Sequence, residues 1–162
     1  MADGGASSMI MLITALLISG GASALLLSQW SDALGVVQSQ DRAAIAKGDV
    51  DVALAGDPAM VSYNTTTKTI TLFFVNSGNI ALETTDYEVL INGAAPTSTT
   101  ETVLPSGTDW EPGRLLEVEL TNTNWTFADG DDVRVFFVGV SESVSGASYS
   151  ATTSGEVRLH VV

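Results

Sequence analysis

The first third of the chain carries one long apolar stretch. No charged residue stands between Asp3 and Asp32, and the most apolar part runs over residues 9–27. At 1.5 Å per residue, a helix of about 20 residues spans the roughly 30 Å of a bilayer's hydrocarbon core. Trp30 follows at the position expected of an interfacial aromatic side chain. The pattern therefore predicts one transmembrane helix over about residues 9–27.

The flanks of this stretch favour a helix that is retained and extended. Ala22-Ser23-Ala24 has the small-x-small form of a signal-peptide cleavage site, but no Lys or Arg precedes the apolar run, and the run continues past the site. The residues from Ser31 to Lys47 are also compatible with a helix, and we expect this helix to end at Gly48. We expect residues 1–48 to form an uncleaved membrane anchor and a spacer helix.

Small residues recur at four-residue spacing within the apolar stretch. Ser19, Gly20, Ser23 and Ala24 would share one side of the helix. Small side chains let transmembrane helices approach closely, although Gly and Ala are also common in such helices without that role. We interpret this side as a candidate packing surface for another helix.

From Asp49 onward the apolar positions change to a period of two. Short runs rich in β-branched and aromatic residues alternate with clusters of Gly, Pro, Asn and Asp, and Asn92-Gly93 is a strong hairpin-turn signal. Six to nine short strands without intervening helices indicate a mainly β fold. We predict an immunoglobulin-like antiparallel β-sandwich over residues 49–162, a resemblance of architecture only, because the cysteine pair of immunoglobulins is missing.

The alternation also predicts which side chains form the core. The residues expected to point inward are Ile70, Leu72, Phe74, Val89, Ile91, Leu116, Val118, Leu120, Val133, Val135, Phe137, Val157, Leu159 and Val161.

Two of the predicted strands are apolar on their outward positions as well. Phe73 and Val75 alternate with inward residues in one strand, and Phe136, Val138 and Val140 do so in another. If the two strands are neighbours, these side chains form one apolar patch, which marks a protein interface. Alternatively, loops cover the patch or both faces belong to the core.

Composition narrows the possible functions. Six basic against nineteen acidic residues give a net charge of −13, which argues against nucleic acid as a partner. The positive mean hydropathy of +0.28 agrees with a membrane segment. The absence of cysteine excludes disulfides and thiolate metal sites. His160 is the single histidine, which argues against a histidine-based catalytic triad.

Candidate chemistry is sparse. Glu117 and Glu119 share one face of a strand, which is more typical of a solvated sheet face than of a catalytic pair. Residues 129–132 read DGDD and could ligate Ca²⁺, but a charged β-turn is the commoner structure for such a run. We therefore predict a non-enzymatic protein without cofactor, metal or small-molecule substrate.

Two sequons, at Asn64 and Asn124, are candidate glycosylation sites. They weakly support a β domain on the outer side of the membrane. We expect a single-pass protein of the cell membrane with an extracytoplasmic β domain. The positive-inside rule, applied to Arg42 and Lys47, instead favours the opposite orientation.

Several motifs occur in an order that resembles a known family. Residues 56–64 read GDPAMVSYN, residues 67–72 read TKTITL, residues 75–78 read VNSG and residues 89–93 read VLING. Following an N-terminal membrane helix, this order resembles the FlaG family of archaellum (archaeal flagellum) stator proteins. Gly56 stands where Asn is common in that family. The partner family FlaF has the same architecture and is the second choice.

The resemblance implies a stator-like subunit that tethers the archaellum motor to the archaeal cell envelope. Its implied partners are a FlaF-like stator protein and a surface-layer protein, in a homo- or hetero-oligomer. Two alternatives stay open. One is a subunit of a pilus- or archaellum-type filament with the helix in its core, and the other is a membrane-tethered enzyme or solute-binding domain.

Overall fold

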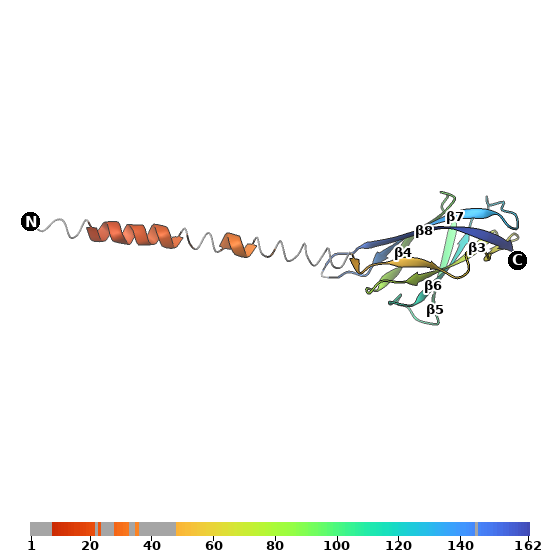
Figure 1. The fold of residues 1–162 in the computed structure, drawn as a ribbon, viewed down its shortest axis with the longest axis horizontal. Coiled ribbons are helices and arrows are strands. Elements are labelled where there is room, and N and C mark those ends of the chain that lie inside the picture. The colour runs from red at the N-terminus through yellow and green to blue at the C-terminus, as the bar shows by residue number, and fades with distance from the viewer. Residues whose placement is uncertain (1–7, 22, 24–27, 33–34, 36–47, 145) are drawn as a thin grey trace, which may run out of the picture. The chain divides into compact units, whose positions relative to one another are not determined.

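The computed structural model describes residues 8–21, 23, 28–32, 35, 48–144 and 146–162 (Figure 1). The chain divides into two compact units, Met1–Ala43 and Ala44–Val162, which are described separately. Of the expected helix-packing residues, Ala24 lies outside the described residues, as do residues 36–47 of the expected spacer.

The described N-terminal residues are helical, as the apolar pattern predicts. Residues 8–21, 23, 28–32 and 35 have helical geometry, and their apolar side chains are exposed. Among the described residues, no helix combines the length and the apolar character needed to cross a bilayer. Residues 22 and 24–27 of the expected span are not among them, so the membrane span stays a prediction.

Hydroxyl groups in this helix bond to their own backbone. Thr14 Oγ1 donates to the carbonyl of Ile10 at 2.8 Å, and Ser23 Oγ donates to the carbonyl of Ser19 at 2.8 Å. Such bonds satisfy a hydroxyl without any partner outside the helix. Ser19, Gly20 and Ser23 thus present a small surface, and its role in packing against another helix stays a prediction.

The second unit contains eight strands. They are β1 (Val52–Ala55), β2 (Val61–Asn64), β3 (Thr69–Asn76), β4 (Leu82–Ile91), β5 (Ser98–Leu104), β6 (Leu115–Thr121), β7 (Asp132–Ser141) and β8 (Ser150–Val161). The mainly β fold is therefore confirmed.

The strands form one sheet in the order β4-β7-β8-β2-β3-β6-β5, and β1 pairs with the second half of β3. The groups β1-β3-β6-β5 and β4-β7-β8 have the strand order of the two sheets of an immunoglobulin domain. Here β2 pairs with both β3 and β8 and joins the two groups, so the sheet is nearly closed. Figure 1 shows β7 and β8 along the upper side of the domain and β5 and β6 along the lower side.

One strand pair departs from the expected antiparallel arrangement. β2 and β8 run parallel, with Val61 opposite Leu159 and Tyr63 opposite Val161. The strand β8 is long enough to pair with β7 over Ser150–Arg158 and then with β2 over its last residues. Through these two pairings, β8 connects the two groups of strands in one sheet.

At the open side of the sheet, β4 and β5 approach each other without forming a ladder. Tyr87 Oη on β4 donates a hydrogen bond to Glu101 Oε2 on β5 at 3.3 Å. Burial is the main cause that raises the pKa of the Tyr87 phenol; a hydrogen bond with Thr99 opposes the rise, and the negative charge of Glu101 adds to it. The seam between the two edge strands is thus bridged by side chains.

The core lies inside the bent sheet and agrees closely with the alternation in the sequence. Thirteen of the fourteen expected residues have 2% or less of their surface exposed, and Val161 is partly buried against them. The core also includes residues outside that expected set, namely Val50, Val52, Tyr63, Leu82, Val103, Trp110, Trp125 and Ala151.

The family-like motifs have structural roles in this fold. Asn76 is fully buried, and its side-chain Nδ2 donates to the carbonyls of Ile80 and Trp110, both at 2.9 Å. A Cβ atom added at Gly78 would collide with the backbone of Asp49 and Asp51. Residues 76–78 therefore form a tight corner directly after β3. This corner packs against residues 49–51, which precede β1 in the chain.

The Asn92-Gly93 turn forms as expected, but it does not connect two paired strands. Both residues have positive φ, at 50° and 79°, and Ile91 and Ala94 exchange hydrogen bonds across the turn. After Ala94 the chain leaves β4, because the next strand, β5, pairs with β6 instead. The predicted turn is therefore confirmed, but the chain after it does not pair with β4 to form a hairpin.

Candidate interaction surfaces

The apolar outward residues fall on two separate surfaces, because the condition for a single patch, that their two strands are neighbours, is not met. The strands β3 and β7 are not neighbours in the sheet. Their inward residues Phe74 and Phe137 stack across the core with ring centroids 4.1 Å apart. Phe73 and Phe136, which alternate with them, therefore point away from each other on opposite outer faces.

The first surface is a groove on the outer face beside β3, which we call the Met60 groove. It encloses about 280 Å³ and is lined by Ala55, Gly56, Asp57, Met60, Val61, Ser62, Thr71 and Phe73. Met60 is 64% exposed, whereas Phe73 is half-buried between β1 and β6. Val75 lies two residues further along β3 and is also half-buried.

The second surface is the outer face of β7, which we call the Phe136 patch. Its residues are Phe136, Val138 and Val140. Phe136 is 41% exposed and lies between Leu90 of β4 and Ser154 of β8. Val138 and Val140 are half-buried on the same face. Whether either surface binds a partner stays a prediction.

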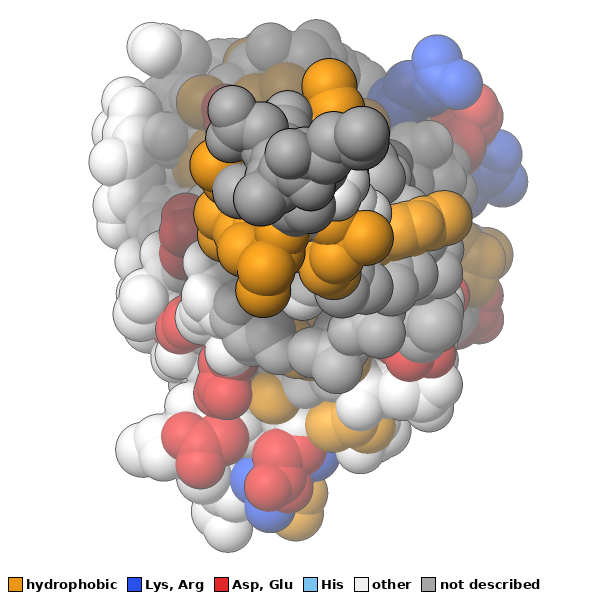
Figure 2. Space-filling view, turned by 90° about the vertical axis from the view of Figure 1, so that its left-hand side faces the viewer, with side chains coloured by type: hydrophobic (Ala, Val, Ile, Leu, Met, Phe, Trp, Pro, Cys, Tyr) orange, Lys and Arg blue, Asp and Glu red, His pale blue; other side chains and the backbone are white. Residues whose placement is uncertain are grey.

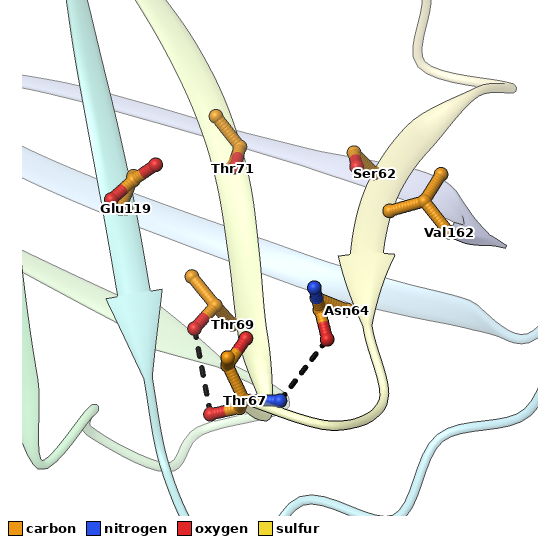
Figure 3. A pocket seen from close by; sticks show the side chains of 7 residues that line it. All are labelled: Ser62, Asn64, Thr67, Thr69, Thr71, Glu119 and Val162. Atoms are coloured by element: carbon orange, nitrogen blue, oxygen red, sulfur yellow. Dashed lines mark hydrogen bonds between the residues drawn. The ribbon is translucent and has the colours of Figure 1, made fainter.

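A third hollow, of about 330 Å³, is polar (Figure 3). Figure 3 shows Thr69 and Thr71 on β3 between Glu119 on β6 and Ser62 and Asn64 on β2. Asn64 Oδ1 accepts hydrogen bonds from the backbone N–H groups of Thr66 and Thr67. Among the residues that line this hollow, Glu119 is the one ionisable side chain, so they offer no acid–base pair.

The two sequons differ in their surroundings. The Asn64 side chain is half-buried and shapes the turn between β2 and β3 through the bonds just described. Asn124 is exposed in a turn, and the side chain of the next residue, Trp125, is buried. Glycosylation at either asparagine stays a prediction.

The acidic loop at residues 129–132 is a turn held by protein donors. Asp129 Oδ1 accepts from the backbone N–H of Val161 at 2.9 Å and lies 3.1 Å from Nδ1 of His160. Asp131 Oδ2 accepts from the N–H of Ala128. In the part of the chain that the structure describes, no group of His, Asp or Glu side chains is arranged to hold a metal ion.

Asp132 completes this loop with an ion pair to the neighbouring strand. Its two carboxylate oxygens accept from Nε and Nη2 of Arg158 at 2.8 and 2.9 Å. This charge-assisted hydrogen bonding is the main cause that lowers the pKa of Asp132 below its usual value. The pair joins β7 to β8 at the surface of the domain.

The glutamates on β6 lie on the outer face of the sheet. Glu117 is half-buried opposite Phe73, and Glu119 is exposed opposite Thr71. Figure 2 shows acidic side chains scattered over the visible face, with basic side chains confined to a few places. This agrees with the strongly negative net charge of the chain.

Comparison with solved structures gives matches of very different strength. The chain matches a protein of the archaeal flagellum of Methanospirillum hungatei strain JF1 with a TM-score of 0.61 and 19% identity, over 97% of this chain and 94% of the other. A weaker match is AvmM, which catalyses macrocyclization in alchivemycin A biosynthesis, with a TM-score of 0.38 and 9% identity over 69% of this chain and 89% of the other. Another is the periplasmic chaperone SfaE, with a TM-score of 0.32 and 14% identity over 68% of this chain and 55% of the other.

No family model matches the chain, and no curated protein matches it in sequence. The FlaG assignment therefore stays a prediction. At 19% identity, the likeness to the flagellar protein is one of fold, and it extends over nearly the full length of both chains.

Proposed function

We propose that this chain is a non-enzymatic structural subunit of an archaellum. One observation carries the proposal: its fold matches a protein of an archaeal flagellum over 97% of the chain.

Within this role, we favour a stator-like subunit of the cell membrane, with its β domain outside and a FlaF-like protein and a surface-layer protein as partners. The support is the order of an apolar N-terminal segment followed by the four motifs between residues 56 and 93. These motifs form the corner at Asn76 and Gly78 and the turn at Asn92. They therefore support a fold in common with the FlaG family as much as a role in common with it.

A filament subunit is the second candidate. The match to the flagellar protein covers 94% of that chain as well as 97% of this one, so both have nearly the same extent. In this role the apolar helix would pack in the filament core and the β domain would lie outside.

Two fractions of cells that produce the tagged full chain separate these roles. A stator-like subunit should be found in mild detergent extracts of membranes, together with motor and FlaF-like proteins, and should be scarce in filaments sheared from the cells. A filament subunit should be a major protein of the sheared filaments, with an N-terminus cleaved just before the apolar run. Recovery with neither fraction would contradict the proposal as a whole.

A further inference from the structure

The β domain carries far more carboxylates than basic side chains. Residues 48–162 contain sixteen Asp and Glu residues, against three Arg, one Lys and one His. Among the described residues, three of these carboxylates form ion pairs, namely Glu111 with Arg114, Asp129 with His160 and Asp132 with Arg158. In that part of the chain, the other thirteen carboxylates have no basic group within ion-pair distance.

Folding gathers several of these carboxylates at one end of the domain. Leu82 pairs with Ser141 on one side and with Trp110 on the other. Neighbouring strands lie about 4.8 Å apart, so the backbones at Trp110 and Ser141 are separated by two such spacings, or roughly 10 Å. The residues next to Trp110 and Ser141 in the chain include three exposed carboxylates, Asp109, Glu111 and Glu142.

The corner after β3 brings two more carboxylates to this end. Asn79 donates to Asp49 twice, from its backbone N–H to the carbonyl at 2.7 Å and from Nδ2 to Oδ1 at 3.1 Å. Ser77 Oγ donates to Asp51 Oδ2 at 2.8 Å. The same corner binds the carbonyl of Trp110 through its buried side-chain amide, so both groups of carboxylates belong to one end of the domain.

We call these five carboxylates the acidic end; its members are Asp49, Asp51, Asp109, Glu111 and Glu142. In the segments that form it, Arg114 is the one basic residue, and its Nε lies 3.5 Å from Glu111 Oε2. The donors to Asp49 and Asp51 are neutral groups, which leave the negative charge in place. Four of the five carboxylates are therefore without a counter-charge.

Distance decides how the repulsion at the acidic end responds to salt. About 30 residues separate Glu111 from Glu142 in the chain, which corresponds to roughly 30 Å in the unfolded state. In the folded domain the separation is roughly 10 Å. The Debye length is about 10 Å at 0.1 M ionic strength and about 3 Å at 1 M. The repulsion therefore acts mainly in the folded state, and concentrated salt removes it.

We infer that the acidic end makes the β domain a salt-dependent fold, whose stability rises with ionic strength because salt screens the repulsion among these carboxylates. Salt also weakens ion pairs, but the described part of the domain has three of these, all partly exposed, against thirteen unpaired carboxylates. The net effect of salt is therefore stabilising. The inference concerns the physical state of the domain, so it goes beyond the proposed function and does not depend on it.

Thermal unfolding of the full chain in a nonionic detergent tests the inference, followed by the fluorescence of the buried Trp110 and Trp125. The melting temperature of the unchanged chain should rise between about 0.1 M and about 1 M NaCl. Asp109→Asn combined with Glu142→Gln removes two charges of the acidic end at exposed positions. At the lower salt concentration this variant should melt about 2 °C or more above the unchanged chain, and at the higher one within about 1 °C of it.

Glu117→Gln combined with Glu119→Gln is the matched control, because it removes the same charge from another place. These two residues are close in the chain, so their mutual repulsion is similar in the folded and unfolded states. Their cross-strand neighbours are uncharged, namely Phe73 and Thr102 beside Glu117 and Thr71 and Thr100 beside Glu119. At about 0.1 M NaCl, this control should gain less than half of the increase in melting temperature that the first variant shows.

Three results would overturn the inference. One is a melting temperature of the unchanged chain that stays constant or falls as NaCl is added. Another is a variant at Asp109 and Glu142 that gains as much from salt as the unchanged chain, because the gain would then reflect the general effect of salt on apolar burial. The third is an equal response of the control at Glu117 and Glu119, which would distribute the effect over the whole surface.

Discussion

Phe137 is the residue at which most aromatic contacts of the core converge. Its ring stacks on Phe74 at 4.1 Å and on Tyr87 at 5.6 Å, and it meets Trp110 edge-on at 5.9 Å. These partners come from three different segments of the chain. Loss of this one ring therefore loosens contacts across the whole width of the domain.

Phe137→Ala should lower the free energy of unfolding by about 3–5 kcal/mol, because it leaves a cavity in a packed core. This is a large part of the about 5–15 kcal/mol that usually stabilises a domain. Chemical denaturation followed by tryptophan fluorescence measures it. Phe136→Ala, one residue away on the outer face, is the matched control and should change stability by about 0.5 kcal/mol or less. Equal stability of the two variants would contradict the assigned faces.

The ion pair of Asp132 and Arg158 predicts a specific dependence on pH. Because the folded pKa of Asp132 is lowered, the pair contributes stability above the unfolded pKa, and this contribution is lost as the pH falls through the folded pKa. Arg158→Gln should return the Asp132 pKa to its usual range, as followed by carboxyl NMR titration. Arg114→Gln, which removes a different ion pair, should leave the Asp132 pKa unchanged.

At this scale the alternation correctly predicted inward residues of β3, β4, β6, β7 and β8, but it missed other buried strand residues such as Tyr63, Leu82 and Val103. It missed Trp110 and Trp125, because they lie outside the regular strands, where no period exists to mark them. It could not assign a role to Asn76, because a polar residue at a strand end is usually exposed. Its burial depends on carbonyls from Ile80 and Trp110, which only the folded chain brings together.

At the scale of the elements, the corner after β3 depends on the absence of a side chain. Gly78→Ala should destabilise the domain strongly, because its Cβ would collide with the backbone of Asp49 and Asp51, which cannot give way as a flexible side chain can. Gly155→Ala is the matched control, since its Cβ would make an ordinary contact, 3.6 Å from Leu54 Cδ2. Thermal unfolding compares them, and equal melting temperatures would refute the role of this corner.

Strand pairing was less predictable than strand position. The Asn92-Gly93 turn was recognised from two residues, because its positive φ angles are a local property. The parallel pair of β2 and β8 has no such signature, since it joins four residues near the start of the domain to others near residue 160. The two apolar outer faces were likewise found in the sequence, but their separation depends on this pairing order.

At the scale of the whole molecule, the division into two units predicts distinct behaviour in extraction. The full chain should stay with membranes through an alkaline carbonate wash, because its apolar N-terminal stretch satisfies its backbone in lipid as a helix. A chain shortened to residues 49–162 should be recovered in the supernatant with a β-rich circular dichroism spectrum. Release of the full chain by the wash would contradict a membrane anchor.

For the whole chain, the order of short motifs resembles an archaellum family, and a protein of an archaeal flagellum has a similar fold. The choice between stator and filament subunit could not be made from sequence, because both roles require an apolar helix followed by a β domain. It depends on which surfaces meet a neighbour.

The long strand β8 has a consequence for how the domain is made. β2 is synthesised early, yet one of its two edges stays unpaired until the last residues of β8 have been added. A growing chain therefore cannot close the sheet between β2 and β8 before β8 itself has been synthesised. Until then this edge of β2 stays open to any other strand that can pair with it.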